Sequence, residues 1–285
     1  MVFRLFGSMR SARLASSALA TLAPLAALVA LVAVVACSTS STSTPTPAGD
    51  DAGVDPAADG GAEEAVDAAA TVPEDAGPDP LVGCTKDPGA PAISVDPSSA
   101  TDPAGSPSAF TLAKALEGFP AAGGKLYAGI RTEYGGIKCE LFESAAPISV
   151  ANFVGLARGT RPYKNDKGTW RVGHFYDGLL WHRVAPGFVI QGGDPDGLGS
   201  GGPGYDLVPE NQVDEPLGTL AMAASAQVSG SQFYVVVGTG PKPEYNVFGT
   251  CDTPTAIAIS NVAHDRTEAP LTEVHMTKVE IARCP

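Results

Sequence analysis

The segment from Phe175 to Asp194 places three side chains of different chemistry within nine positions of a largely apolar run. Arg183 is a permanent cation, Phe188 is an aromatic ring and Gln191 carries an amide. Charged side chains are rare in apolar runs unless they are paired or functional. Together these groups could hold an apolar ring in a slot and direct fixed hydrogen-bond donors at the polar atoms beside it, without a nucleophile or a metal.

The whole segment closely resembles the active-site strand of the cyclophilins. Further stretches that resemble the family follow in its order: Val150–Gly155, the glycine-rich Gly192–Tyr205, Gly218–Ala223, Gly230–Tyr234 and Val247–Gly249. The resemblance covers about residues 124–282. It implies peptidyl-prolyl cis-trans isomerase activity. It also implies an all-β fold, a closed eight-stranded antiparallel barrel capped by two short helices.

The resemblance assigns a role to each of these residues. Arg183, Phe188 and Gln191 would be the catalytic residues, as hydrogen-bond donor, floor of the proline pocket and carbonyl-binding amide. The substrate-binding residues would be Val189, Ala223, Gln232, Tyr234 and Tyr245. An X-Pro bond exchanges over tens to hundreds of seconds because twisting it removes amide resonance. A donor to the pyramidal proline nitrogen would contact the twisted bond more strongly than either planar form.

The chain departs from the family pattern at the outer wall of the pocket. The family often has a Trp-Leu-Asp-Gly segment and then a His before Val-Phe-Gly. Here the stretch is Gly240–Asn246, which has no Trp, and Tyr245 stands near the position of the His. The departure favours an altered substrate preference and weak binding of cyclosporin, which uses that Trp in the family. It leaves open an alternative function, a catalytically weak proline-peptide binding or chaperone module of the cell envelope.

Hydrophobic patterns predict many strands, separated by Gly and Pro, and two short helices. The predicted strands are 126–132, 136–142, 179–190, 219–223, 232–237, 247–250 and 273–282. Pro147 begins a helix with apolar residues at helical spacing, and Gly159 ends it. A second helix is predicted at 255–262. This order favours a closed barrel over a βαβ fold. The loop 160–174, rich in Lys and Arg, is interpreted as solvated.

The N-terminus has the pattern of a targeting segment. Three arginines are followed by an uncharged apolar run from 14 to 36, and Cys37 comes next. The small residues before Cys37 resemble a bacterial lipobox, which predicts a lipoprotein signal peptide at 1–36 and lipidation of Cys37. The alternatives are an uncleaved membrane helix and an ordinary secretory signal. All three export the chain, and we expect a membrane-anchored lipoprotein facing the periplasm or the cell exterior.

The composition changes twice after the leader. Residues 37–83 hold ten acids and no Lys, Arg or aromatic residue, which predicts a disordered acidic tether. Residues 84–120 are interpreted as an extension packed on the domain, and 121–285 as the isomerase domain. The net charge of −13 disfavours nucleic acid and anionic lipid surfaces as partners. We expect a monomer that contacts the membrane through its lipid anchor only and binds proline-containing segments of unfolded or exported proteins.

The remaining four cysteines favour disulfides in an exported chain. Of the three possible pairings, Cys139 with Cys251 would join two predicted strands, and Cys84 with Cys284 would join the ends of the ordered region. Buried free thiols are the alternative. No Cys or His has metal-ligand spacing, so neither a metal nor a cofactor is predicted.

Overall fold

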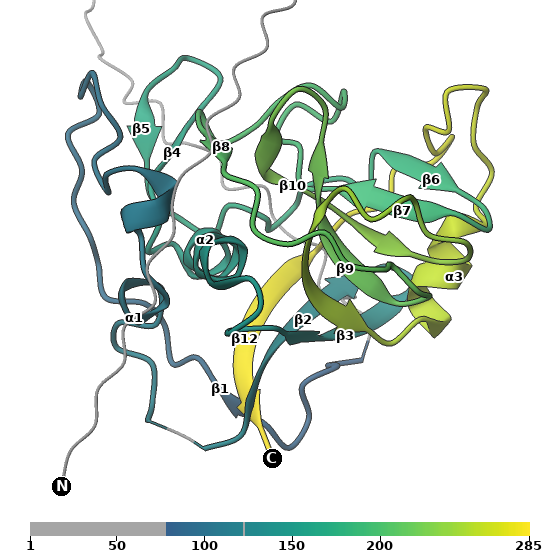
Figure 1. Ribbon diagram of the computed structural model, residues 1–285, viewed down its shortest axis with the longest axis horizontal. Helices are drawn as coiled ribbons and strands as arrows, with labels where there is room; N and C mark the ends of the chain where they lie inside the picture. The colour runs from purple at the N-terminus through teal and green to yellow at the C-terminus, as the bar shows by residue number, and fades with distance from the viewer. Residues whose placement is uncertain (1–77, 122) are drawn as a thin grey trace, which may run out of the picture. The chain divides into compact units, whose positions relative to one another are not determined.

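The computed structural model describes residues 78–121 and 123–285, and Figure 1 shows their arrangement. The predicted signal peptide at 1–36, Cys37 and nearly all of the predicted tether at 37–83 lie outside the described residues. Within the described part, the fold is mostly β-sheet with few helices.

Twelve strands and three α-helices are found among the described residues. The strands are β1 Thr85–Lys86, β2 Lys125–Thr132, β3 Gly135–Leu141, β4 Tyr163–Lys164, β5 Trp170–Arg171, β6 Arg183–Ala185, β7 Val189–Gly192, β8 Asp206–Leu207, β9 Thr219–Ala224, β10 Val228–Val236, β11 Asn246–Cys251 and β12 Lys278–Cys284. The helices are α1 Leu112–Ala115, α2 Pro147–Arg158 and α3 Pro254–Ser260, with a 3-10 turn η1 at Pro107–Ala109. The predicted long strands and both predicted helices have counterparts in this set, whereas the two-residue strands were not predicted.

Ten of the strands form one antiparallel sheet in the order β1-β12-β2-β3-β11-β9-β10-β7-β6, with β8 paired to β10. The sheet thus has ten strands where eight were predicted, because the two-residue strands β1 and β8 add to it. In the described part of the chain the hydrogen-bonded path begins at β1 and ends at β6. The segments before β6 and before β12 are joined by an isolated bridge between Leu180 and His275 and by backbone hydrogen bonds of 2.7–2.8 Å around it, outside the named strands. Closure into a barrel thus stays a prediction.

The predicted strand 179–190 is wrong as a single element. The structure divides it into β6 and β7, which form an antiparallel hairpin. Pro186 and Gly187 lie at the turn, where the Phe188 N–H donates to the Ala185 carbonyl over 3.0 Å and Gly187 has a φ of 72°. Pro-Gly is a strong turn signal because Pro fixes its own φ and Gly tolerates a positive one. The hairpin brings both strands of the predicted site to one place.

Helix α2 forms the centre of the hydrophobic core. Pro147 lies in its first turn, and Gly159 caps its end in the left-handed conformation with φ 76°. Its residue Phe153 is fully buried, and its ring lies 4.9–5.4 Å from the rings of Tyr176, Phe233 and Phe248. The helix therefore supports β10 and β11 from behind, on the side of the sheet away from the predicted pocket.

A buried arginine ties the N-terminal extension to the end of α2. Arg158 makes a two-pronged ion pair with Asp87, with Nε–Oδ2 and Nη2–Oδ1 distances of 2.8 and 2.9 Å. It also donates to the backbone carbonyls of Ala115 and Glu117. In Figure 1 the extension, in blue, lies on the other side of α2 from the β6–β7 hairpin. The extension thus stabilises the domain far from the predicted site.

The interpretation of 160–174 as a solvated loop is wrong at its start and again at Trp170, which is buried. Arg161 is fully buried, with its Nη2 2.5 Å from Asp102 Oδ2 and its guanidinium over the rings of Phe110 and Tyr205. The Phe110 ring in turn lies so close to Gly155 of α2 that a Cβ there would be 2.5 Å from it. A cation can be buried here because a carboxylate and two π faces replace its water.

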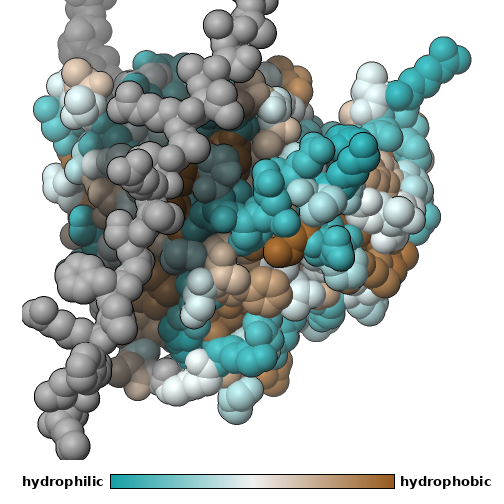
Figure 2. Space-filling model, viewed as in Figure 1, coloured by the Kyte–Doolittle hydropathy of each residue, from teal (hydrophilic) through white to brown (hydrophobic). Residues whose placement is uncertain are grey.

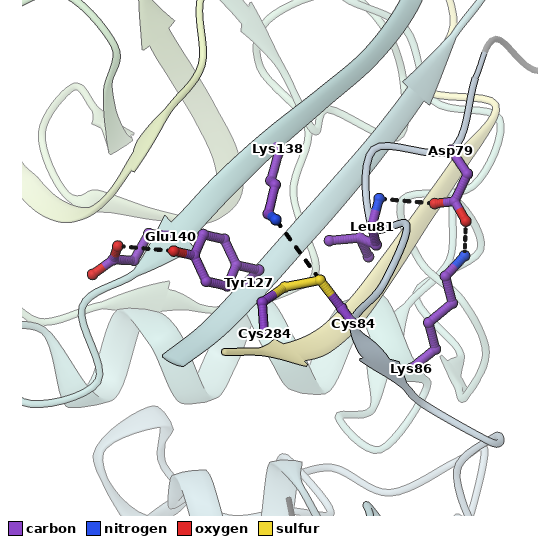
Figure 3. The surroundings of a disulfide bond; sticks show 8 residues. All are labelled: Asp79, Leu81, Cys84, Lys86, Tyr127, Lys138, Glu140 and Cys284. Carbon is purple, nitrogen blue, oxygen red and sulfur yellow. Dashed lines mark hydrogen bonds and ion pairs between the residues drawn. A yellow bond between two sulfur atoms is a disulfide. The ribbon is translucent and has the colours of Figure 1, made fainter. Parts of the chain in front are cut away.

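The four cysteines of the described part form two disulfides, in the pairing that the sequence favoured. Cys139 and Cys251 join β3 to β11, and Cys84 and Cys284 join the extension to β12. Figure 3 shows the second bond, with Lys138 Nζ 3.7 Å from the Cys84 sulfur. Since β1 also pairs with β12, the first and last described strands are held together twice.

Figure 2 shows one face of the molecule, on which hydrophobic residues (brown) surface in separate areas between polar ones (teal). Searching the described residues for a membrane-spanning helix finds none of sufficient length and apolar character. In the same residues no group of three or more His, Cys, Asp and Glu is arranged to hold a metal ion.

Candidate active site

The β6–β7 hairpin places Arg183 opposite Gln191. The two are direct partners in its antiparallel register, so their side chains project from the same face. The Arg183 Nη1 donates to Gln191 Oε1 over 3.4 Å, a long hydrogen bond. The guanidinium carbon lies 5.7 Å from the centre of the Phe188 ring. Three residues predicted to be catalytic therefore lie together.

Strand β10 adds a second amide beside the first. Gln191 Nε2 donates to Gln232 Oε1 over 2.9 Å, and Gln232 Nε2 donates to the Gly201 carbonyl over 2.9 Å. Each amide has two N–H donors, and these bonds use one of each. Both amides line the same cavity, and neither of these bonds uses the second N–H of its amide.

A pocket of about 300 Å³ opens beside the arginine. Its lining residues are Arg183, Phe188, Val189, Gln191, Ala223, Ala224, Tyr234, Pro241 and Tyr245. Seven of the eight residues predicted for the site are in this set. The eighth, Gln232, lines an adjoining cavity of about 660 Å³ together with Gln191 and the glycine-rich loop. The site is thus an apolar pocket with a cation at its edge, continuous with a wider groove.

The wall of the pocket is made by two tyrosines. The rings of Tyr234 and Tyr245 meet edge to face, with 5.5 Å between their centres. The Tyr234 hydroxyl donates to Glu215 Oε2 over 2.5 Å, and Glu215 is itself buried. Burial raises the pKa of Glu215, although its hydrogen bond from Tyr234 acts in the opposite direction. Burial, together with this carboxyl, also raises the pKa of Tyr234 far above its usual range, so the phenol stays neutral.

His182 directly precedes Arg183 in the sequence, but it is not a second positive charge. Burial lowers the pKa of His182, so the ring is mainly neutral at neutral pH. Neither ring nitrogen has a hydrogen-bond partner within the described part of the chain. Arg183 is therefore the charged group among the residues that line the pocket.

The comparisons with known proteins identify the family. Residues 127–281 match the family model described as cyclophilin type peptidyl-prolyl cis-trans isomerase, which is more than half of the chain. The chain belongs to the cyclophilin family. The predicted enzyme class is therefore confirmed, and the chain is a peptidyl-prolyl cis-trans isomerase.

Individual bacterial cyclophilins are similar over the same region. The probable peptidyl-prolyl cis-trans isomerase A of Mycobacterium leprae is 42% identical over 165 residues, which cover 54% of this chain and 90% of that protein. Isomerase B of Streptomyces anulatus is 38% identical, covering 55% and 97% of the two chains. Isomerase B of Bacillus subtilis is 45% identical, covering 40% and 73%.

Several residues that line the pocket or contact its lining were not predicted from the sequence. Pro241 lines the pocket in the stretch that lacks the family's Trp, and Ala224 lines it beside Ala223. Glu215 holds Tyr234, and Glu268 lies 2.6 Å from Arg183 Nε. The lost Trp motif marked the Pro241 stretch as unusual. No local pattern marks Glu215 or Glu268, since each acts on a partner 19 or 85 residues away.

Proposed function

We propose that Arg183 accelerates prolyl isomerisation by donating a hydrogen bond to the proline nitrogen of the twisted imide. The observation that carries this proposal is that Arg183 lies at the edge of an apolar pocket, above Phe188. Twisting the bond removes resonance and leaves a lone pair on the nitrogen. A preorganised donor contacts that lone pair in the transition state and has little to contact in the planar forms.

The other residues of the pocket bind the substrate in this mechanism. The proline ring lies against Phe188, with Val189, Ala223 and Tyr234 around it. Gln191 and Gln232 each direct their remaining N–H at a carbonyl of the substrate backbone. These contacts hold the chain on one side of the imide while the other side rotates. No proton transfer is required, so the rate should be nearly independent of pH around neutrality.

The arginine is tested by comparing the purified chain with its Arg183→Ala variant, using exchange NMR of a proline-containing peptide. We expect kcat/KM to fall by about a hundredfold or more, as when one transition-state donor is removed. The melting temperature should change little because Arg183 is partly exposed. Arg171→Ala, on an exposed β5 residue, is the matched control and should behave like the wild type. Unchanged turnover in Arg183→Ala would defeat the mechanism.

We further infer that the enzyme is a lipid-anchored lipoprotein that acts on exported proteins. The apolar leader, the small residues before Cys37 and the polar tether that follows support this inference. The two disulfides support it too, because such bonds persist mainly outside the cytoplasm. Palmitate labelling of a bacterium that makes the full chain should mark the wild type and not Cys37→Ser. Labelling of both proteins equally would refute the anchor.

The finer statement of the fold is also our proposal. We infer that the ten-stranded sheet curves into the closed barrel of the family, with the eight strands other than β1 and β8 forming the wall. The antiparallel order of its strands and the bridge between Leu180 and His275 support closure. An experimental structure that leaves the two sides of the sheet apart would contradict it. We infer a monomer as well, which sedimentation at micromolar concentration would test.

A further inference from the structure

The active-site arginine has a second partner outside the pocket. The Glu268 carboxylate accepts a hydrogen bond from Arg183 Nε over 2.6 Å, much shorter than the 3.4 Å contact with Gln191. We propose that Glu268 is the positioning residue of Arg183, holding the guanidinium by Nε so that its Nη donors serve the pocket. This inference rests on the role proposed for Arg183 above.

The backbone at Glu268 is itself unusual. Its φ is 68°, and among the described residues it alone has a positive φ without being glycine. For a residue with a Cβ this conformation is strained, and it persists only where the surroundings enforce it. Here the Val184 N–H donates to the Glu268 carbonyl over 2.7 Å. Because Val184 follows Arg183, the two residues of the ion pair are fixed to each other through the backbone as well.

The loop that carries Glu268 is closed by its own hydrogen bonds. Asp265 Oδ1 accepts from the Thr267 N–H and hydroxyl, each over 2.7 Å, and from the Ala269 N–H over 3.1 Å. The Glu268 N–H donates to the Asp265 carbonyl over 3.2 Å. These side-chain and backbone hydrogen bonds close the turn, and they lower the pKa of Asp265 because they favour its ionised form. The carboxylate of Glu268 is therefore presented from a preformed turn.

The physical need for such a residue follows from the exposure of Arg183. Its side chain is 35% exposed and has four rotatable bonds, so water competes for every donor. The long bond to Gln191 is a weak restraint. A charge-assisted bond to Nε restricts the guanidinium plane, and it leaves Nη2 and the second N–H of Nη1 to contact a substrate. The carboxylate also offsets part of the positive charge. A hydrogen bond to one nitrogen lone pair depends more on the direction of the donor than on its net charge. The gain in rate from positioning Arg183 should therefore exceed the loss from reducing its charge.

Three variants of the full chain distinguish the effect of the Glu268 carboxylate on activity from the effect of its backbone conformation. Glu268→Ala removes the acceptor, Glu268→Gln keeps an acceptor without charge, and Glu268→Gly removes the acceptor while relieving the positive φ. We expect kcat/KM for a proline peptide to fall by about tenfold in the Ala and Gly variants, and by about threefold or less in the Gln variant. Peptide affinity, measured by NMR titration, should stay within about twofold, because Glu268 does not line the pocket.

The matched control is Glu133→Gln. Glu133 pairs with His275, its side chain is 35% exposed against 39% for Glu268, and it does not line the pocket. This variant should keep wild-type kcat/KM. Circular dichroism and melting temperature establish whether every variant is folded. If Glu268→Ala does not fold, Glu268→Gly takes its place in the test.

A double-mutant cycle decides whether Glu268 acts through the arginine. In an Arg183→Ala background, Glu268→Ala should have almost no further effect on kcat/KM. The inference is overturned if Glu268→Gly keeps wild-type turnover, if turnover rises, or if the two substitutions act additively. A peptide affinity that falls as much as kcat/KM would also overturn it. If Arg183→Ala alone is as active as the wild type, the proposed mechanism fails instead, so the two failures are distinguishable.

Discussion

Two regions of this molecule contain the same kind of ion pair, an arginine with a carboxylate, and the pairs have different roles. At the N-terminal extension, the Arg158 and Arg161 side chains are 1% and 0% exposed and pair with Asp87 and Asp102. At the pocket, Arg183 is 35% exposed and pairs with Glu268. All three arginines also lie near the face of a phenylalanine ring.

The difference lies in which donors are already used. The guanidinium of Arg158 donates hydrogen bonds to Asp87 and to two backbone carbonyls, so it is held in place as part of the fold. Among the described residues, Arg183 has one short hydrogen bond, from Nε to Glu268, and one long bond from Nη1 to Gln191 at the edge of the pocket. An arginine can therefore serve catalysis when one side is fixed and the other is left open. The extension should govern stability and the hairpin should govern activity.

The largest effect is expected at the extension, where a substitution should reduce stability and leave activity unchanged. Arg158→Met leaves the partly buried Asp87 and the carbonyls of Ala115 and Glu117 without their partner, which costs about 3–5 kcal/mol of unfolding free energy. Urea unfolding at neutral pH would measure the loss, and the kcat/KM of the folded fraction should not change. Arg171→Met is the control on an exposed arginine. A stability within error of the wild type would contradict the structural role of the pair.

The second effect is the loss of the bond between the extension and β12. Replacing Cys84 and Cys284 together with serine opens a disulfide whose residues are 200 positions apart. We expect a loss of about 3 kcal/mol, because the unfolded chain gains conformational freedom. Thermal unfolding of the double variant and the wild type, both free of reductant, would measure it. Activity at low temperature should be retained. An isomerase that loses turnover while keeping its melting temperature would reverse the assignment of the two regions.

A smaller effect is expected at the floor of the pocket. Phe188→Ala removes the ring beneath Arg183, and we expect kcat/KM to fall by about tenfold through lost apolar contact with the proline ring. The melting temperature should fall little, because Phe188 is only partly buried. Phe188→Leu is the control that keeps an apolar floor, and it should recover most of the activity. Equal activity in all three proteins would show that the proline ring binds elsewhere.

The smallest effect concerns pH and the wall of the pocket. Burial raises the pKa of Glu215, so the folded chain holds this proton more tightly than the unfolded chain does. The stabilising contribution is therefore complete below the unfolded pKa and is lost as pH rises through the folded one. Glu215→Gln does not titrate. Its melting temperature relative to the wild type should rise between about pH 4 and about pH 7. A difference that stays constant with pH would contradict the raised pKa.

Local patterns predicted much of the fold. Strands β2 and β3 and helix α2 lie within two residues of their predicted bounds, because alternation, Pro147 and Gly159 are local signals. The strand predicted at 179–190 was wrong, although Pro186 and Gly187 marked the turn. The residues of the pocket were predicted from the family resemblance rather than from periodicity.

By itself, the sequence determined that an arginine, a phenylalanine and two glutamines would meet in one site, since their spacing along paired strands matches a known family. Only the tertiary structure decided which arginines are buried and which carboxylates hold them. Arg158 and Asp87 are 71 positions apart, and Arg183 and Glu268 are 85 apart. Such contacts depend on the paths of the intervening loops. Those paths are set by packing over the whole domain and leave no local pattern to read.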